Sequence, residues 1–143
     1  MTTNIICQPI PNSIVSDFVL SSGYELESSK KLFGEVAKFL LVASRSDVAL
    51  APSPAVDAAW HDFILHTRDY DRYCRTAFGF FVHHAPIRGV TDPNRYRYLA
   101  TLAALREVFG EPDPFFWPSH EAFLNEVCDS DCSGDSGGGG GDR

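Results

Sequence analysis

The sequence predicts an all-α domain of about five helices, followed by a flexible glycine-rich tail. Apolar residues recur at helical spacing in several segments, and no segment shows the sustained alternation of apolar and polar residues that is typical of a strand. The chain has 143 residues, of which 44% are hydrophobic and 13% aromatic, enough to fill one core without disulfides. We therefore expect a helical domain over residues 1–127 and a tail over residues 128–143.

The first two helices are predicted from apolar periodicity. A short helix is expected over Ser13–Ser21, ending near Gly23, and a longer one from about Glu25 to Ala43. The stretch "SRSDVALAPS" then ends the pattern.

Two later helices share a start signal in which an oxygen-bearing cap precedes a proline. Ser53-Pro54 and Asp92-Pro93 both have this form, and a proline in the first turn loses no hydrogen bond because its N–H would have no helical partner. The helix from Asp92 is expected to end at Phe109-Gly110. After "EPDPFFWP", which the prolines keep irregular, Ser119 is expected to cap a last short helix through about Val127.

The segment from Pro54 to Phe78 can be one helix or two. As one helix at roughly 100° per residue, it places a stripe of residues within an arc of about 80°, which we interpret as the face toward the core. Alternatively Thr67, with Asp69 two residues later, starts a new helix and bends the chain. The stripe consists of Val56, Trp60, Phe63, Thr67, Tyr70, Cys74 and Phe78.

The formal charge of -7 comes without a basic stripe, so partners with phosphate backbones or anionic membranes are not expected. The N-terminus lacks the features of a signal peptide, and the longest apolar run, "FLLVA", is too short to span a bilayer. The sequence therefore predicts a cytoplasmic protein. In that compartment Cys128 and Cys132 of the tail are interpreted as thiols or a loose metal or redox site, not as a structural disulfide.

The stretch from Trp60 to Pro86 holds four of the five histidines. His61 and His66 are five residues apart and lie on different sides of a helix, so a site on this helix needs a further residue from elsewhere. The segment "FFVHHAP" is expected to run back over the helix in an extended, strand-like form. Adjacent side chains of an extended segment point to opposite sides, so only one of His83 and His84 is expected to be a ligand.

The candidate site therefore combines His61 with His83 or His84 and adds Cys74, Asp62 or His66. Imidazole and thiolate ligands suit a transition metal such as zinc, copper or iron. Two alternatives stay open. The histidines can form a structural hydrogen-bond cluster, with Cys74 packed as a small buried side chain, or Cys74 and His61 can form a nucleophile pair if the helix is broken.

The pattern of these residues resembles a family of small uncharacterised bacterial proteins, similar in turn to the helical module of the glycine-rich domain-containing proteins of plants. The resemblance covers roughly Ser53 to Pro118. It implies that a glycine-rich tail after cysteines is a family feature, and it implies no reaction. The plant version has a second histidine two residues after the "WH" histidine, where this chain has Phe63. The residues that carry the resemblance are "VDxxWH" at Val56–His61, Tyr70, Cys74, Phe78-Gly79 and His83-His84.

Two functions follow as hypotheses, and whether the protein is an enzyme stays open. The first is a binding or adaptor module, with or without a metal, whose tail with Cys128 and Cys132 is recognised by a protein partner or a modifying enzyme. The second is a small metalloenzyme that uses His61, His83 and His84. A partner surface is also expected in "EPDPFFWP"; the alternative is that its aromatic residues cover one end of the core. These aromatic residues are Phe115, Phe116 and Trp117.

Overall fold

The computed structural model describes residues 7–84 and 92–119 and consists of five α-helices in this part of the chain, where no strand occurs. This confirms the predicted all-α class. The helices are α1 (Asn12–Ser22), α2 (Leu26–Arg45), α3 (Pro54–Leu65), α4 (Thr67–Phe78) and α5 (Asp92–Phe109).

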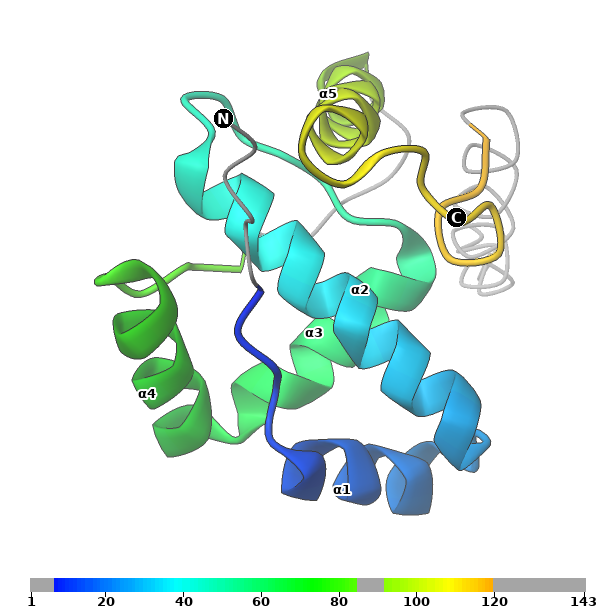
Figure 1. Cartoon of the computed structure of the whole chain (residues 1–143), viewed down its shortest axis with the longest axis vertical. Coiled ribbons are helices and arrows are strands. Elements are labelled where there is room, and N and C mark those ends of the chain that lie inside the picture. Colours follow the sequence, from blue (N-terminus) through cyan, green and yellow to red (C-terminus); the bar gives the residue numbers. More distant parts are fainter. Residues whose placement is uncertain (1–6, 85–91, 120–143) are drawn as a thin grey trace, which may run out of the picture.

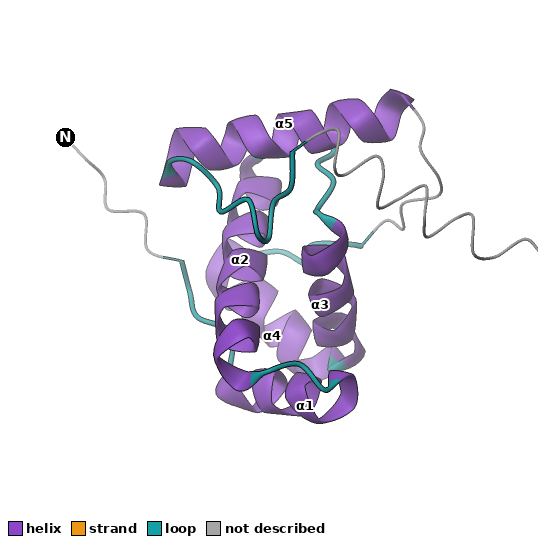
Figure 2. Ribbon diagram, turned by 90° about the vertical axis from the view of Figure 1, so that its right-hand side faces the viewer, coloured by secondary structure: helices purple, strands orange, loops and turns teal. Residues whose placement is uncertain are grey.

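Helix α2 is the central element, and the other helices are arranged around it. Helix α3 packs against α2 and crosses it (Figure 1), while α1 lies across one end of this pair and α5 across the other (Figure 2). Helix α4 follows α3 after a sharp turn and contacts both α2 and α3. The core therefore lies between α2 and α3, and α1 and α5 close its two ends.

The first two helices match the predicted segments within one or two residues. Helix α1 ends at Gly23, which has a φ of 75° and donates its N–H to the carbonyl of Val19, as expected for a glycine cap. Helix α2 runs on to Arg45 and buries nine side chains, among them Phe39 and Leu40. Its length lets one helix contact every other helix of the bundle.

The segment from Pro54 to Phe78 forms two helices, which supports the alternative with a new start at Thr67. Ser53 caps α3 by accepting a hydrogen bond from the N–H of Val56. At His66 the backbone leaves the helical region, with φ -83° and ψ 69°, and α4 begins at Thr67. The prediction of one continuous stripe was therefore wrong at Thr67, which is exposed because it is the first residue of α4 after the bend, whereas Tyr70, Tyr73 and Cys74 of α4 are buried.

Apart from Thr67, the stripe residues face the core as the sequence predicts. Val56, Trp60, Phe63, Tyr70 and Cys74 are buried, and Phe78 is partly buried and packs against them. They pack against the buried face of α2, where Phe39 meets the ring of Trp60 edge-on at 5.2 Å. The aromatic-rich stretch is thus also the centre of the core.

Two further predictions concern the end of the helical part. Helix α5 runs from Asp92 to Phe109, followed by Gly110 at φ 87°, as expected. Residues 81–84 belong to no helix or strand and return over α3, where His84 packs against Trp60, which agrees with the predicted return of this segment over the helix. The predicted helix through Val127 and the predicted tail lie outside the described residues.

None of the described helices is both long and apolar enough to cross a bilayer.

Candidate metal-binding site and adjoining cavity

The irregular segment after α4 places His84 over one face of α3. Asp57, Trp60 and His61 occupy positions i, i+3 and i+4 of α3, so their side chains lie next to one another on the helix surface. The His84 ring contacts all three: its Nε2 lies 2.7 Å from Oδ1 of Asp57, and its ring centre lies 4.4 Å from that of Trp60 and 5.9 Å from that of His61. The structure thus brings together two of the predicted histidines.

Asp57 selects one tautomer of His84. An ionised carboxylate can only accept hydrogen bonds, so Nε2 of His84 donates to Asp57, and in the neutral imidazole the lone pair is then on Nδ1. The His84 side chain is only 12% exposed, and the Trp60 ring restricts its rotation. A histidine whose second nitrogen donates to a carboxylate is the usual arrangement of a metal ligand.

The position of the returning segment depends on one phenol. The hydroxyl of Tyr70 on α4 accepts a hydrogen bond from Nε1 of Trp60 on α3 and donates one to the carbonyl of Val82. This contact joins α3, α4 and the segment that carries both histidines. Its burial prevents water from replacing either bond, and burial also raises the pKa of Tyr70 above its usual range.

Cys74 takes part in this packing and lies apart from the histidine pair. Its partners are Tyr70 and the backbone of Val82, and the residue is fully buried. Burial raises the pKa of the thiol, so Cys74 stays protonated near neutral pH. This arrangement fits the alternative in which Cys74 packs as a small core side chain.

The other predicted ligands point elsewhere. His83 is exposed and packs against Phe81 at 4.8 Å, on the opposite side of the segment from His84. His66 lies at the junction of α3 and α4, 3.8 Å from Asp17. Asp62 is half-buried, and its Oδ2 has no hydrogen-bond partner among the described residues. Within residues 7–84 and 92–119, no group of three or more His, Cys, Asp or Glu side chains is arranged to hold a metal ion.

The predicted aromatic surface near the end of the described chain is mostly buried. Phe116 and Trp117 are 6% and 3% exposed and cover the core, whereas Phe115 is 74% exposed. The Trp117 indole donates to Glu35 of α2, which fixes this segment on the bundle. Only one of the three rings therefore offers a surface to a partner. Cys128 and Cys132 lie outside the described residues.

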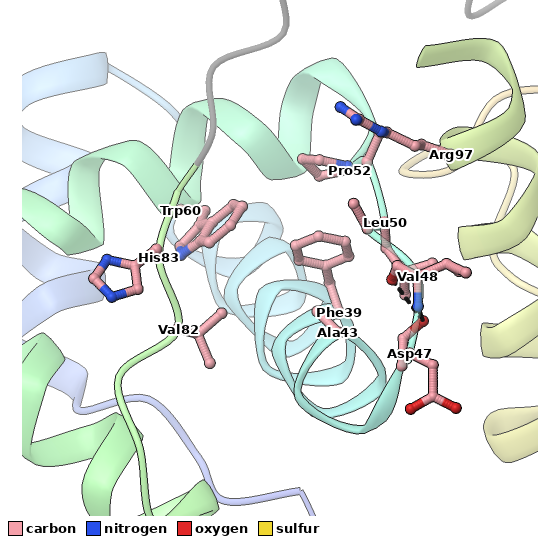
Figure 3. A pocket seen from close by; sticks show the side chains of 13 residues that line it. Phe39, Ala43, Asp47, Val48, Leu50, Pro52, Trp60, Val82, His83 and Arg97 are labelled. Atoms are coloured by element: carbon pink, nitrogen blue, oxygen red, sulfur yellow. Dashed lines mark hydrogen bonds between the residues drawn. The ribbon is translucent and has the colours of Figure 1, made fainter. Parts of the chain in front are cut away.

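A cavity of about 300 Å³ is lined by Trp60 (Figure 3), the same residue against which His84 packs. It lies between the end of α2, the loop from α2 to α3, residues Val82 and His83, and the first turns of α5. Phe39 and Trp60 lie at its base, and Arg97 and Asp47 lie at different places on its rim.

Sequence reasoning missed Asp57 and Arg97. Asp57 stands four residues before His61, and this spacing already places both side chains on one helix face. Arg97 carries no local signal, because the cavity is assembled from four segments that are distant in the sequence.

Comparisons with known proteins give a family but no activity. No curated protein and no solved structure matches the chain. The UCP032817-like family model matches residues 19–108, which include α2, α3, α4 and the histidine pair. Since this match covers more than half of the sequence, the chain belongs to the UCP032817-like family.

Proposed function

We propose that this protein is a metal-dependent binding module in which His61 and His84 hold one transition metal ion. The observation that carries the proposal is the 2.7 Å contact between Asp57 and Nε2 of His84, which leaves Nδ1 of a nearly buried imidazole as a metal ligand. A purely structural histidine needs no second imidazole beside it, whereas His61 lies next to this ring.

The spacing of the two rings supports the proposal. Two imidazoles that bind one ion at metal–nitrogen distances of about 2.0–2.1 Å and at a tetrahedral angle have ring centres about 5 Å apart. The ring centres of His61 and His84 are 5.9 Å apart, so the two rings need to approach by less than about 1 Å. His61 is exposed, so its side chain can adjust by a rotamer change at little cost.

Two protein ligands leave the remaining coordination positions open. A structural zinc site is closed by four protein ligands, whereas an open position accepts water or a group of a partner. Imidazole ligands suit zinc, copper and nickel. The proposed ion would therefore present its open positions to a donor group of a bound partner. The small metalloenzyme stays a hypothesis that requires the same ion.

The test is titration of metal-free full-length protein with Zn²⁺ and, separately, with Cu²⁺ by isothermal calorimetry. The background carries Cys128→Ser and Cys132→Ser, so that the tail thiols do not bind the ion. We expect one equivalent to bind, His61→Ala and His84→Ala each to weaken binding at least tenfold, and Asp57→Asn to weaken it about 10–100-fold.

His66→Ala and His83→Ala are the matched controls, because each removes an imidazole outside the proposed site. Circular dichroism establishes that every variant is folded. Binding that His61→Ala and His84→Ala leave unchanged, or the absence of saturable binding to the folded parent, would show that the histidine pair is a structural hydrogen-bond cluster.

A further inference from the structure

The cavity beside Trp60 has the features of a binding site that is separate from the histidine pair. Its volume of about 300 Å³ is at the lower end of the range of small-molecule sites. Figure 3 shows Phe39 and Trp60 at its base, with Val82 and His83 on one side and the loop with Val48 and Leu50 on the other. His84 does not line this cavity, although it packs against the same indole.

The walls of the cavity are held in place without a ligand. The hydroxyl of Thr101 on α5 donates to the carbonyl of Ala51 at 2.7 Å and accepts from the N–H of Ala51 at 3.0 Å, which fixes the loop against α5. The opposite wall is fixed by the bond from Tyr70 to the carbonyl of Val82. A ligand would thus not have to order these segments on binding.

The base of the cavity selects for an apolar group. The indole N–H of Trp60 is already bonded to Tyr70, so the cavity meets only the apolar ring. Phe39 adds a second ring, and Ala43 is small enough to leave the space between them and the loop open. The part of a ligand that enters the cavity is therefore expected to be compact and apolar.

The rim selects for charge. Among the described residues, Arg97 is the only lysine or arginine that lines this cavity, and its guanidinium forms no ion pair with any of them. The planar guanidinium matches a carboxylate in a two-point contact. Asp47 also lines the cavity, but Figure 3 places it away from Arg97.

A larger cavity differs from this one because its cationic side chains are already paired. It measures about 430 Å³ and lies between the segment that precedes α1 and one side of α2. Its two cations, Lys30 and Lys38, already pair with Glu27 and Glu35 at 3.3 Å. That cavity therefore offers no free charge to orient a ligand, whereas Arg97 does so beside Trp60.

We propose that the cavity between Trp60 and Arg97 binds a small organic anion with a compact apolar body and one carboxylate group. The apolar body lies between Val48, Leu50 and Val82, above the nearly buried rings of Phe39 and Trp60, and the carboxylate pairs with Arg97. Because the chain carries a net charge of -7, it repels anions in general, and binding depends on this local cation.

The test uses three probes of nearly equal size, namely benzoate, benzyl alcohol and benzylamine, titrated into the ¹⁵N-labelled full-length protein. We expect benzoate to give saturable shifts in the amides of residues 46–51 and 82–83, and benzyl alcohol to bind at least tenfold more weakly. Arg97→Ala should weaken benzoate binding at least tenfold and leave the binding of benzyl alcohol unchanged.

Arg75→Ala is the matched control, because Arg75 is an exposed arginine on α4 that pairs with Asp71 outside the cavity. It should leave benzoate binding unchanged. Three results would overturn the proposal: no saturable shifts with benzoate, equal binding of benzoate to Arg97→Ala and the parent, or preferential binding of benzylamine that Asp47→Asn abolishes. None of these results depends on whether a metal binds to His61 and His84.

Discussion

At the scale of single residues, the Tyr70 hydroxyl joins α3, α4 and the segment that carries His84. It is bonded on both sides, to the indole N–H of Trp60 and to the carbonyl of Val82, and the ring is fully buried. Tyr73, on the same helix, makes one bond from its hydroxyl to the carbonyl of Gln8 at 2.6 Å. The two phenols therefore offer a matched comparison.

We predict that Tyr70→Phe destabilises the protein by about 1–3 kcal/mol, because it leaves one buried donor and one carbonyl without a partner. Tyr73→Phe should cost about 1 kcal/mol or less, since only the carbonyl of Gln8 loses its partner and Gln8 is half-exposed. Urea unfolding of both variants gives the comparison. Equal losses would mean that the two bonds of Tyr70 do not act together.

The sequence predicted the relative directions of side chains where these depend only on neighbouring residues. The alternation of an extended chain correctly separates His83 from His84, although the segment forms no strand. The choice between them needed the structure, because it depends on which side faces Asp57. Arg97 could not be predicted, since its role depends on the packing of α5 against the loop from α2 to α3.

At the scale of single helices, two glycines allow the effect of backbone conformation on stability to be measured. Gly34 lies inside α2 and Gly79 caps α4 with a φ of 85°. A Cβ added at either position would meet no atom within 4 Å. The two positions thus differ in backbone conformation and not in available space.

Gly34→Ala should stabilise the protein by up to about 1 kcal/mol, because alanine has the higher helix propensity. Gly79→Ala should destabilise it by roughly 1–2 kcal/mol, because an L-residue is strained in the left-handed region. Thermal unfolding of the two variants beside the parent gives the signs. Changes of the same sign would contradict this account.

The sequence predicted the start of a helix with a clear cap, but it did not decide whether the segment from Pro54 to Phe78 is one helix or two. The cap at Ser53-Pro54 is local and was confirmed. The break at His66 was left open, because Thr67 and Asp69 are only weak start signals. It allows Tyr70 of α4 to reach Trp60 of α3, a contact that periodicity alone does not reveal.

At the scale of the whole molecule, the buried titratable groups predict how stability depends on pH. Burial raises the pKa of Cys74 above its ordinary value of 9.0 and those of Tyr70 and Tyr73 above 10.0. In the unfolded chain these groups lose their protons near the ordinary values, while the folded protein retains them. The folded state therefore binds more protons at alkaline pH, and its stability falls as pH rises.

We predict that the free energy of unfolding decreases above pH 9, first through the thiols of Cys74 and Cys7, whose pKa values burial raises, and then, above pH 10, through the two tyrosines. Each group adds a slope of at most about 1.4 kcal/mol per pH unit. Urea unfolding at pH 8, 9, 10 and 10.5 measures this. Cys74→Ala is the control and should flatten the curve between pH 9 and 10. A stability that is constant over the whole series would disprove the prediction.

The place of Trp60 at both proposed sites has an optical consequence. Its ring lies 4.4 Å from that of His84 and also lies at the base of the cavity. A paramagnetic ion such as Cu²⁺ at His84 would quench the indole fluorescence at this range, whereas an organic anion in the cavity would change the emission by placing a negative charge near the indole. With Trp117→Phe, one indole would then report the occupancy of both sites in a single spectrum.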